Sequence, residues 1–167
     1  MPIAKTIILG IDPGVATTGY AFIKEQNKQT EILDYGVIST SSKQNFSDRL
    51  EYIHLALIKL IKKFKPDVVV VEQLFFCKNV KTALNVGQAR GVILLTAIIN
   101  KLPLYEFTPL QVKQSVCGYG KAEKCQVQAM VKTILGLKQI PKPDDAADAL
   151  AIALTYLQSK KFLDKIK

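Results

Sequence analysis

The fold is decided first by an apolar segment near the N-terminus, Thr6-Ile7-Ile8-Leu9-Gly10-Ile11-Asp12-Pro13-Gly14. Its β-branched and aliphatic residues predict a strand over residues 6–11. The proline and glycine that follow Asp12 predict a turn directly after the strand. The acid therefore stands at the carboxyl end of a strand, which is where open α/β sheets bind their ligands.

Further strands and a helix follow this segment. Residues 20–24 and 31–40 are β-rich runs joined by a short polar link, so the first three strands are expected to form an antiparallel meander. From Phe46 to Phe64, apolar residues recur at helical spacing, which predicts an amphipathic helix. The next run, residues 68–71, consists of four valines without polar alternation, which is typical of a strand covered on both faces. Glu72 ends this strand as Asp12 ends the first.

The second half of the chain is expected to be mainly helical. Residues 79–101 predict a long helix, residues 104–107 a short strand, and Thr108 with Pro109 the start of another helix. Two last helices are expected over residues 122–135 and 144–159. This order predicts an α/β fold with a mixed five-stranded sheet flanked by helices, and with the strands that end at Asp12 and Glu72 in its middle. Without repeats or linkers, residues 1–167 are expected to form a single domain.

The charge balance indicates a polyanionic partner. Lysine and arginine total 23 against 14 acids, which gives a net charge of +9 and a pI near 9.4. Nucleic acid is the first candidate for such a partner, and a basic enzyme whose lysines serve only solubility is the alternative. Arg49 and Arg90 are the only arginines. Because lysine is a point charge rather than a planar fork, this bias favours contact with backbone phosphates over base reading.

Composition also bounds the compartment. Cys77, Cys117 and Cys125 are scattered and form no C-x-x-C pair, so reduced thiols are expected rather than a zinc site. The most apolar stretch, residues 91–99, is far shorter than the roughly 20 residues that span a bilayer. Since Asp12 interrupts the first apolar run, we expect no signal peptide, no membrane association and a soluble, cytoplasmic protein.

Two more acids stand near the C-terminal end. Asp145 and Asp148 are three residues apart on a predicted helix and share one face, and the alanines around them allow close approach to the sheet. Acids at a helix start often only complement the helix dipole, but Asp148 lies a full turn inside. Two carboxylates about 4 Å apart repel by roughly 4 kcal/mol at an effective dielectric near 20. If the four acids converge, they would need a hard cation, and Mg²⁺ suits oxygen ligands.

The motifs together resemble a known family. The segment 8–14 described above, Val71-Glu72-Gln73, residues 85–91 (Asn-Val-Gly-Gln-Ala-Arg-Gly), residues 111–114 with 118–124, and residues 145–153 are similar to the RuvC family of crossover junction endonucleases. The resemblance covers nearly the whole chain, in order and without large insertions. It implies an RNase-H-like fold and a Holliday junction resolvase that makes paired symmetric nicks in four-way DNA junctions during recombination and repair.

The resemblance also implies roles for particular residues. Asp12, Glu72, Asp145 and Asp148 match the metal-binding catalytic acids, which implies Mg²⁺, two ions in each active site, with Mn²⁺ as a substitute. Phe75 matches an aromatic residue that stacks on a base near the junction centre, although a core position is the alternative from sequence alone. The basic residues expected to reach the DNA are Lys113, Lys121 and Lys124.

Assembly and partners are implied as well. The resemblance implies a homodimer and work alongside a branch-migration motor, RuvA with RuvB. Gly87 and Gly91 suit close helix packing, in the core or across a dimer. His54, the only histidine, is expected to be structural or solvent-facing.

Three other classes of protein are alternatives to this function. An actin-like ATPase or sugar kinase also begins with Gly-Ile-Asp-x-Gly, but it needs two related lobes. A DNA-binding module without catalysis is opposed by the presence of all four acids. Another nuclease of the superfamily, acting on RNA hybrids or duplex ends, is separated only by the motif set.

Overall fold

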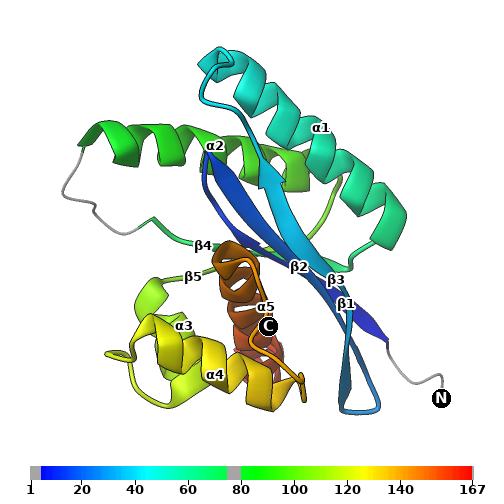
Figure 1. Cartoon of the computed structure of the whole chain (residues 1–167). Helices are drawn as coiled ribbons and strands as arrows, with labels where there is room; N and C mark the ends of the chain where they lie inside the picture. Colours follow the sequence, from blue (N-terminus) through cyan, green and yellow to red (C-terminus); the bar gives the residue numbers. More distant parts are fainter. Residues whose placement is uncertain (1–4, 75–79, 167) are drawn as a thin grey trace.

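The computed structural model describes residues 5–74 and 80–166. Within them a five-stranded sheet has the order β3-β2-β1-β4-β5, with the first three strands antiparallel and β4 and β5 parallel to β1 (Figure 1). The strands are β1 (Thr6–Asp12), β2 (Thr17–Gln26), β3 (Gln29–Ser39), β4 (Val68–Glu72) and β5 (Leu104–Phe107). The helices are α1 (Phe46–Phe64), α2 (Val80–Ile99), α3 (Pro109–Cys117), α4 (Lys124–Ile134) and α5 (Asp144–Ile166).

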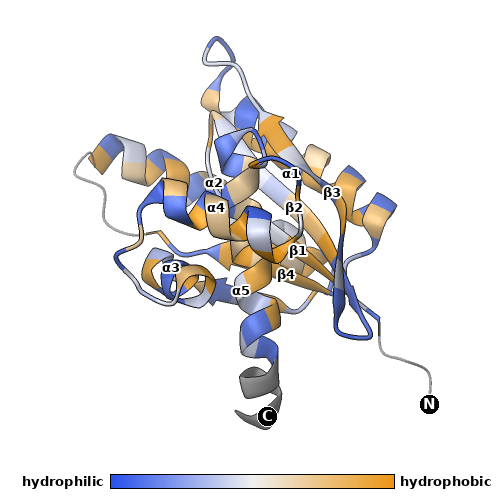
Figure 2. Ribbon diagram, turned by 60° about the horizontal axis from the view of Figure 1, so that its bottom comes forward, coloured by the Kyte–Doolittle hydropathy of each residue, from blue (hydrophilic) through white to orange (hydrophobic). Residues whose placement is uncertain are grey.

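Helices cover both faces of the sheet. The α1 and α2 helices pack on one face, where Leu9, Ile11 and Val71 contribute to the core. The α3, α4 and α5 helices pack on the other, against Ile8 and Val70. Because successive residues of a strand point to opposite faces, each central strand supplies both cores. Apolar residues accordingly gather where the helices meet the sheet (Figure 2).

The predicted element order, the mixed sheet and the central positions of β1 and β4 are confirmed. Some predicted boundaries are wrong. The β2 strand begins at Thr17, inside the expected turn, because it pairs with β3 from Ser39 onward. The α4 helix begins at Lys124 because the Glu123 backbone N–H, at the N-cap, is satisfied by the Gln126 side chain at 2.8 Å. The α5 helix continues past residue 159 to 166, since no proline or glycine interrupts it.

The α2 helix is longer and more apolar than the stretch singled out in the sequence. By length and composition alone its 20 residues would suffice to cross a membrane, and it is the only helix among residues 5–74 and 80–166 that passes this test. Its inner face is buried against the sheet through Ala89, Ile93 and Ala97, whereas its outer face is exposed. His54 of α1 accepts or donates a hydrogen bond with the Thr96 hydroxyl at 2.7 Å, which supports the structural role predicted for it.

Candidate active site

The central strands position the first two acids. The β1 and β4 strands are parallel neighbours with Ile11 opposite Val71, so Asp12 and Glu72 are the next residues along the pair. Both continue the even-numbered series whose side chains face α5. The two carboxylates therefore project from the same end and the same face of the sheet, on strands about 4.8 Å apart.

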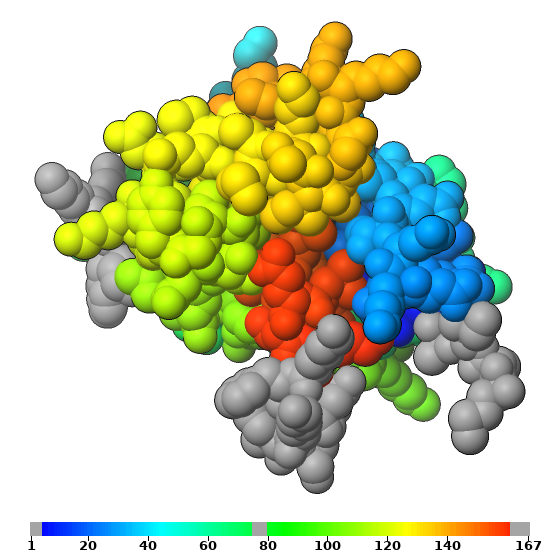
Figure 3. Space-filling view, turned by 90° about the horizontal axis from the view of Figure 1, so that it is seen from below, coloured from blue at the N-terminus to red at the C-terminus, as the bar shows by residue number. Residues whose placement is uncertain are grey.

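The α5 helix supplies the other two acids because it packs unusually close to the sheet. A methyl group added at Gly10 would lie 2.3 Å from the Ala149 carbonyl oxygen, and one added at Gly19 would lie 2.0 Å from that of Asp145. The facing side of α5 is made of small buried residues, among them Ala146, Ala147, Ala149 and Ala153. Figure 3 shows the α5 helix between α3 and α4 on one side and the β2–β3 hairpin on the other. The alanines around the acids thus serve the close approach that the sequence predicted.

Three carboxylates meet at this junction. Asp12, Asp145 and Asp148 each offer an oxygen, and these oxygens lie within 4.8 Å of one another. Two oxygens bound to one Mg²⁺ are separated by at most about 4.2 Å, twice the usual Mg–O distance. The donor set therefore fits a hard divalent cation after a small adjustment. Glu72 is outside this group of three, and it lines the cavity beside it.

The pKa values report how crowded these acids are. Burial raises the pKa of Asp12 to about 8, and the charges of Glu72, Asp148 and Asp145 add to the effect. Burial, followed by the charge of Asp148, raises the pKa of Glu72 to about 7, although Lys113 and Lys124 oppose the shift. Burial also raises the pKa of Asp148. Without a cation, the site therefore retains protons near neutral pH.

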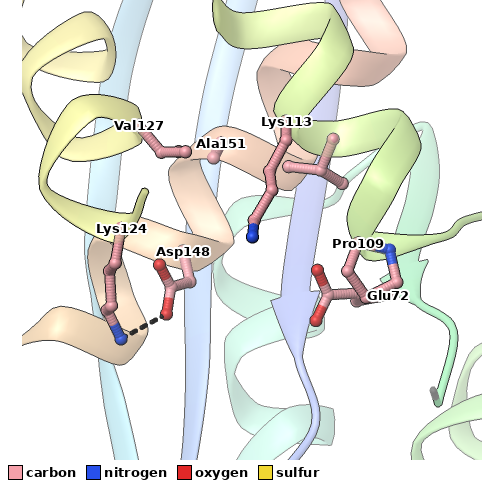
Figure 4. Close-up of a pocket in the computed structure, with 8 residues that line it drawn as sticks. Glu72, Pro109, Lys113, Lys124, Val127, Asp148 and Ala151 are labelled. Atoms are coloured by element: carbon pink, nitrogen blue, oxygen red, sulfur yellow. Dashed lines mark hydrogen bonds and ion pairs between the residues drawn. The ribbon is translucent and has the colours of Figure 1, made fainter. Parts of the chain in front are cut away.

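Two lysines lie beside the acids, in a cavity of about 250 Å³. Lys124 of α4 donates to Asp148 at 2.9 Å. Lys113 of α3 points into the space between Asp148 and Glu72 (Figure 4). A phosphate placed against the acids would find two ammonium groups within the same cavity, so the structure brings together the acids and two of the three predicted basic residues.

The remaining predicted residues have different outcomes. Lys121 is exposed in the loop before α4 and does not line the cavity. Phe75 lies outside the described residues, so its role stays a prediction.

Arg90 is a contributor that the sequence analysis did not assign. Its Nε donates to the backbone carbonyl of Glu72 at 3.4 Å, and its guanidinium also forms an ion pair with Glu106 of β5. The α2 helix is thereby joined to the end of β4 and to the neighbouring strand. The arginine holds the backbone that carries Glu72, on the face of the sheet opposite the cavity. No local pattern in the sequence predicts this contact. Arg90 and Glu106 come together only when the topology places α2 beside β5.

A mixed sheet of this order, with carboxylates at the ends of its two central strands, two more on the helix across them and lysines alongside, defines an RNase-H-like, metal-dependent nuclease. Residues 8–156 match the family described as "Crossover junction endodeoxyribonuclease RuvC". A relative of that name from Halothermothrix orenii is 57% identical over 150 residues, which are 90% of this chain and 91% of the relative. The chain belongs to the RuvC family.

Solved structures agree with this assignment. The RuvC structure from Thermus thermophilus is similar with a TM-score of 0.87 and 36% identity, covering 94% of this chain and 96% of that one. The T. thermophilus RuvC solved in complex with a Holliday junction substrate has a TM-score of 0.85 and 34% identity, with the same coverage. The RNase-H-like fold predicted from the sequence is therefore confirmed.

Proposed function

We propose that this member of the RuvC family is a Holliday junction resolvase, in which Asp12, Glu72, Asp145 and Asp148 carry the metal-dependent hydrolysis of DNA. The observation that carries this proposal is the convergence of three carboxylates within 4.8 Å beside a cavity that also holds Glu72 and two lysines. The similar T. thermophilus protein, solved with a Holliday junction substrate, supports the same substrate for this chain.

The acids would hold Mg²⁺, two ions in each site, with Mn²⁺ as a substitute. Oxygen-only donors and raised pKa values both favour a hard cation, because the cation removes the repulsion that retains protons. When bound, such ions supply the positive charge that stabilises the attacking and leaving oxygens of a phosphodiester. Glu72 and Asp148 face the cavity from opposite sides, and each would offer carboxylate oxygens to these ions.

The lysines would bind the phosphate oxygens of the substrate. Lys124 is already fixed by its ion pair with Asp148, and Lys113 points toward the cavity from α3. Lys121, exposed on the loop, would contact the backbone farther from the cut. Phe75, which follows β4 three residues after Glu72, would stack on a base at the junction centre.

The experiment that tests the catalytic assignment is Asp12→Asn. This variant should bind a four-way junction in a gel shift as tightly as the wild type, yet fail to nick it with Mg²⁺, because one ligand of the cluster has lost its charge. Asp48→Asn, which alters an acid in the first turn of α1, is the matched control and should nick normally. Nicking by Asp12→Asn at the wild-type rate would refute the assignment.

A two-fold dimer would supply the second active site that paired nicks require. The outer face of α2 carries an exposed apolar stripe at helical spacing, formed by Val80, Leu84, Leu95 and Ile98, and Gly91 lies between them with nothing within 4 Å of its added methyl group. These exposed fractions are 57–70%. A second copy of this chain is the occupant that we propose for this stripe. We further propose cooperation with the RuvA–RuvB motor in the cytoplasm.

A further inference from the structure

A second groove lies next to the acid cluster, on the other side of the sheet. Its volume is about 420 Å³, and it is formed by the β1–β2 loop, by α1 and α2, and by Asp145. The lysine-bearing cavity, in contrast, is formed by α3, α4 and α5 together with Glu72. Apart from Asp145 of α5, the second groove is lined by the β1–β2 loop and the α1–α2 layer, whereas the first cavity is lined by the α3–α4–α5 layer and Glu72, so the carboxylates lie between the two hollows.

A DNA strand that presents one phosphate to the acids must continue in both directions. The cavity with Lys113 and Lys124 can receive the strand on one side of the reacting phosphate. The second groove includes another of the four acids, Asp145. Its position fits the continuation of the same strand beyond the cut.

The groove contains an arginine whose orientation is fixed. Arg49 of α1 lines it and donates through Nε to the Thr40 hydroxyl at 2.8 Å. That hydroxyl in turn donates to the Val15 carbonyl at 2.5 Å, and Thr40 N–H donates to the Ala16 carbonyl at 3.0 Å. The guanidinium is thereby tied to the loop that forms the groove wall.

We propose that this groove binds the cleaved DNA strand on the side of the scissile phosphate opposite Lys113 and Lys124, with Arg49 contacting a backbone phosphate there. This rests on the proposed nuclease function and adds a binding subsite to it. A planar guanidinium with Nε already engaged can still present its terminal nitrogens to phosphate oxygens. Asn85 of α2, also in the wall, offers an amide donor to the same backbone.

The first test uses the salt dependence of junction binding, measured in the Asp12→Asn background so that the DNA is not cut. Arg49→Gln should weaken binding roughly tenfold, as expected for a hydrogen bond to a charged group. It should also reduce the slope of log K against log salt by about 0.7–0.9, the value of one lost phosphate contact. Lys62→Gln removes an exposed charge from the last turn of the same helix, and should change neither.

Arg49→Lys separates a phosphate contact from a structural role. Lysine keeps the charge but cannot reproduce the planar fork that bonds Thr40. We therefore expect Arg49→Lys to retain the slope that Arg49→Gln loses. If Arg49 is only structural, both variants will lower the melting temperature alike and leave the slope unchanged, and this result would overturn the proposal.

The second test locates the contact on the strand. Single neutral methylphosphonates are placed one at a time at the phosphates on each side of the cut. In the same Asp12→Asn background, one of them should weaken junction binding without adding to the loss caused by Arg49→Gln. That position should lie on the opposite side of the cut from the position that couples to Lys113→Gln. Additive losses at every position, or coupling on the same side, would overturn the inference. A wild-type protein that does not cut junctions would instead refute the proposed function.

Discussion

At the scale of single residues, the acids of this site are a poor choice for stability alone. Asp12 is half-buried beside three other carboxylates, and burial raises its pKa to about 8, which favours a proton there at neutral pH in the metal-free protein. Such a group weakens folding whenever it is ionised, because the unfolded chain solvates it better. The four carboxylates therefore do not serve stability, and binding of a cation is the role that we propose for them.

The first prediction concerns the pH dependence of the metal-free protein. Because the pKa of Asp12 is raised on folding from 3.8 to about 8, the folded state binds more protons between these values. The stability contributed by protonated Asp12 is complete below pH 3.8 and is lost as the pH rises toward 8. Urea unfolding from pH 5 to 9 should therefore show wild type losing stability relative to Asp12→Asn.

Adding Mg²⁺ should reverse this loss. A ligand that binds only the folded state stabilises it by about 2.7 kcal/mol when its concentration is 100 times its Kd. Protons compete with the ion for the same oxygens, so the stabilisation should be larger at pH 8 than at pH 6. The wild type and Asp12→Asn are compared by their free energies of unfolding. If the difference between them stays constant with pH, with or without Mg²⁺, the raised pKa of Asp12 is wrong.

The second prediction concerns Lys124. Its ion pair with Asp148 is half-exposed, so its contribution to stability should be small. Its contribution to cleavage should be larger, because it would contact a phosphate in the same cavity as the acids. Lys124→Met should lower nicking roughly 10- to 150-fold, the range for a hydrogen bond to a charged group. Lys138→Met, at an exposed lysine outside the cavity, should nick at the wild-type rate, and equal losses in both variants would argue against a specific contact.

At the scale of elements, the distance between α5 and the sheet decides whether the cluster forms. Gly10 permits that distance because no side chain stands between β1 and the Ala149 carbonyl. Gly10→Ala should cost about 1–3 kcal/mol of unfolding free energy, typical of overpacking. It should also reduce nicking more than stability explains, since the displaced helix carries Asp145 and Asp148.

Gly91→Ala is the matched control for this prediction. Its added methyl group meets nothing within 4 Å in the chain, and alanine in a helix interior is favoured over glycine by about 0.5–1 kcal/mol. Urea denaturation of both variants in a Leu95→Glu background, in which the proposed dimer contact around Gly91 is removed, measures the contrast. Equal stability of Gly10→Ala and the wild type would show that the packing at β1 is looser than described.

Much of the arrangement of the elements could be predicted from the sequence. The acids that end β1 and β4, and the pair on α5, follow from strand composition and helical spacing, because those signals are local. The contact between Arg90 and the Glu72 carbonyl, and the anchoring of Arg49 by Thr40, could not be predicted. Each joins elements whose relative placement depends on the whole topology rather than on any short pattern.

At the scale of the whole molecule, the exposed stripe on α2 is the surface that we propose for dimerisation. Leu95→Glu should convert the proposed dimer into monomers, because a charge would have to be buried between two copies. Met130→Glu places the same charge on α4, in the opposite layer, and should leave the dimer intact. Sedimentation velocity at several protein concentrations distinguishes these outcomes. A wild type that sediments as a monomer, both free and on junction DNA, would exclude the interface.

Dimerisation should also decide the pattern of nicks. A Leu95→Glu monomer that keeps its active site should cut one strand of a cruciform plasmid and release before the second cut, yielding nicked circles. The wild type should yield linear products, since two equivalent sites act on one bound junction.

The close packing of α5 has a consequence for the order in which the enzyme is made. Asp12 and Glu72 leave the ribosome before Asp145 and Asp148, which lie far later in the chain. The same helix that brings the last two acids also fills the core against β1 and β2. A chain in which α5 is not yet packed therefore cannot bring the four carboxylates together, so the proposed nuclease activity would arise only after this helix has folded onto the sheet.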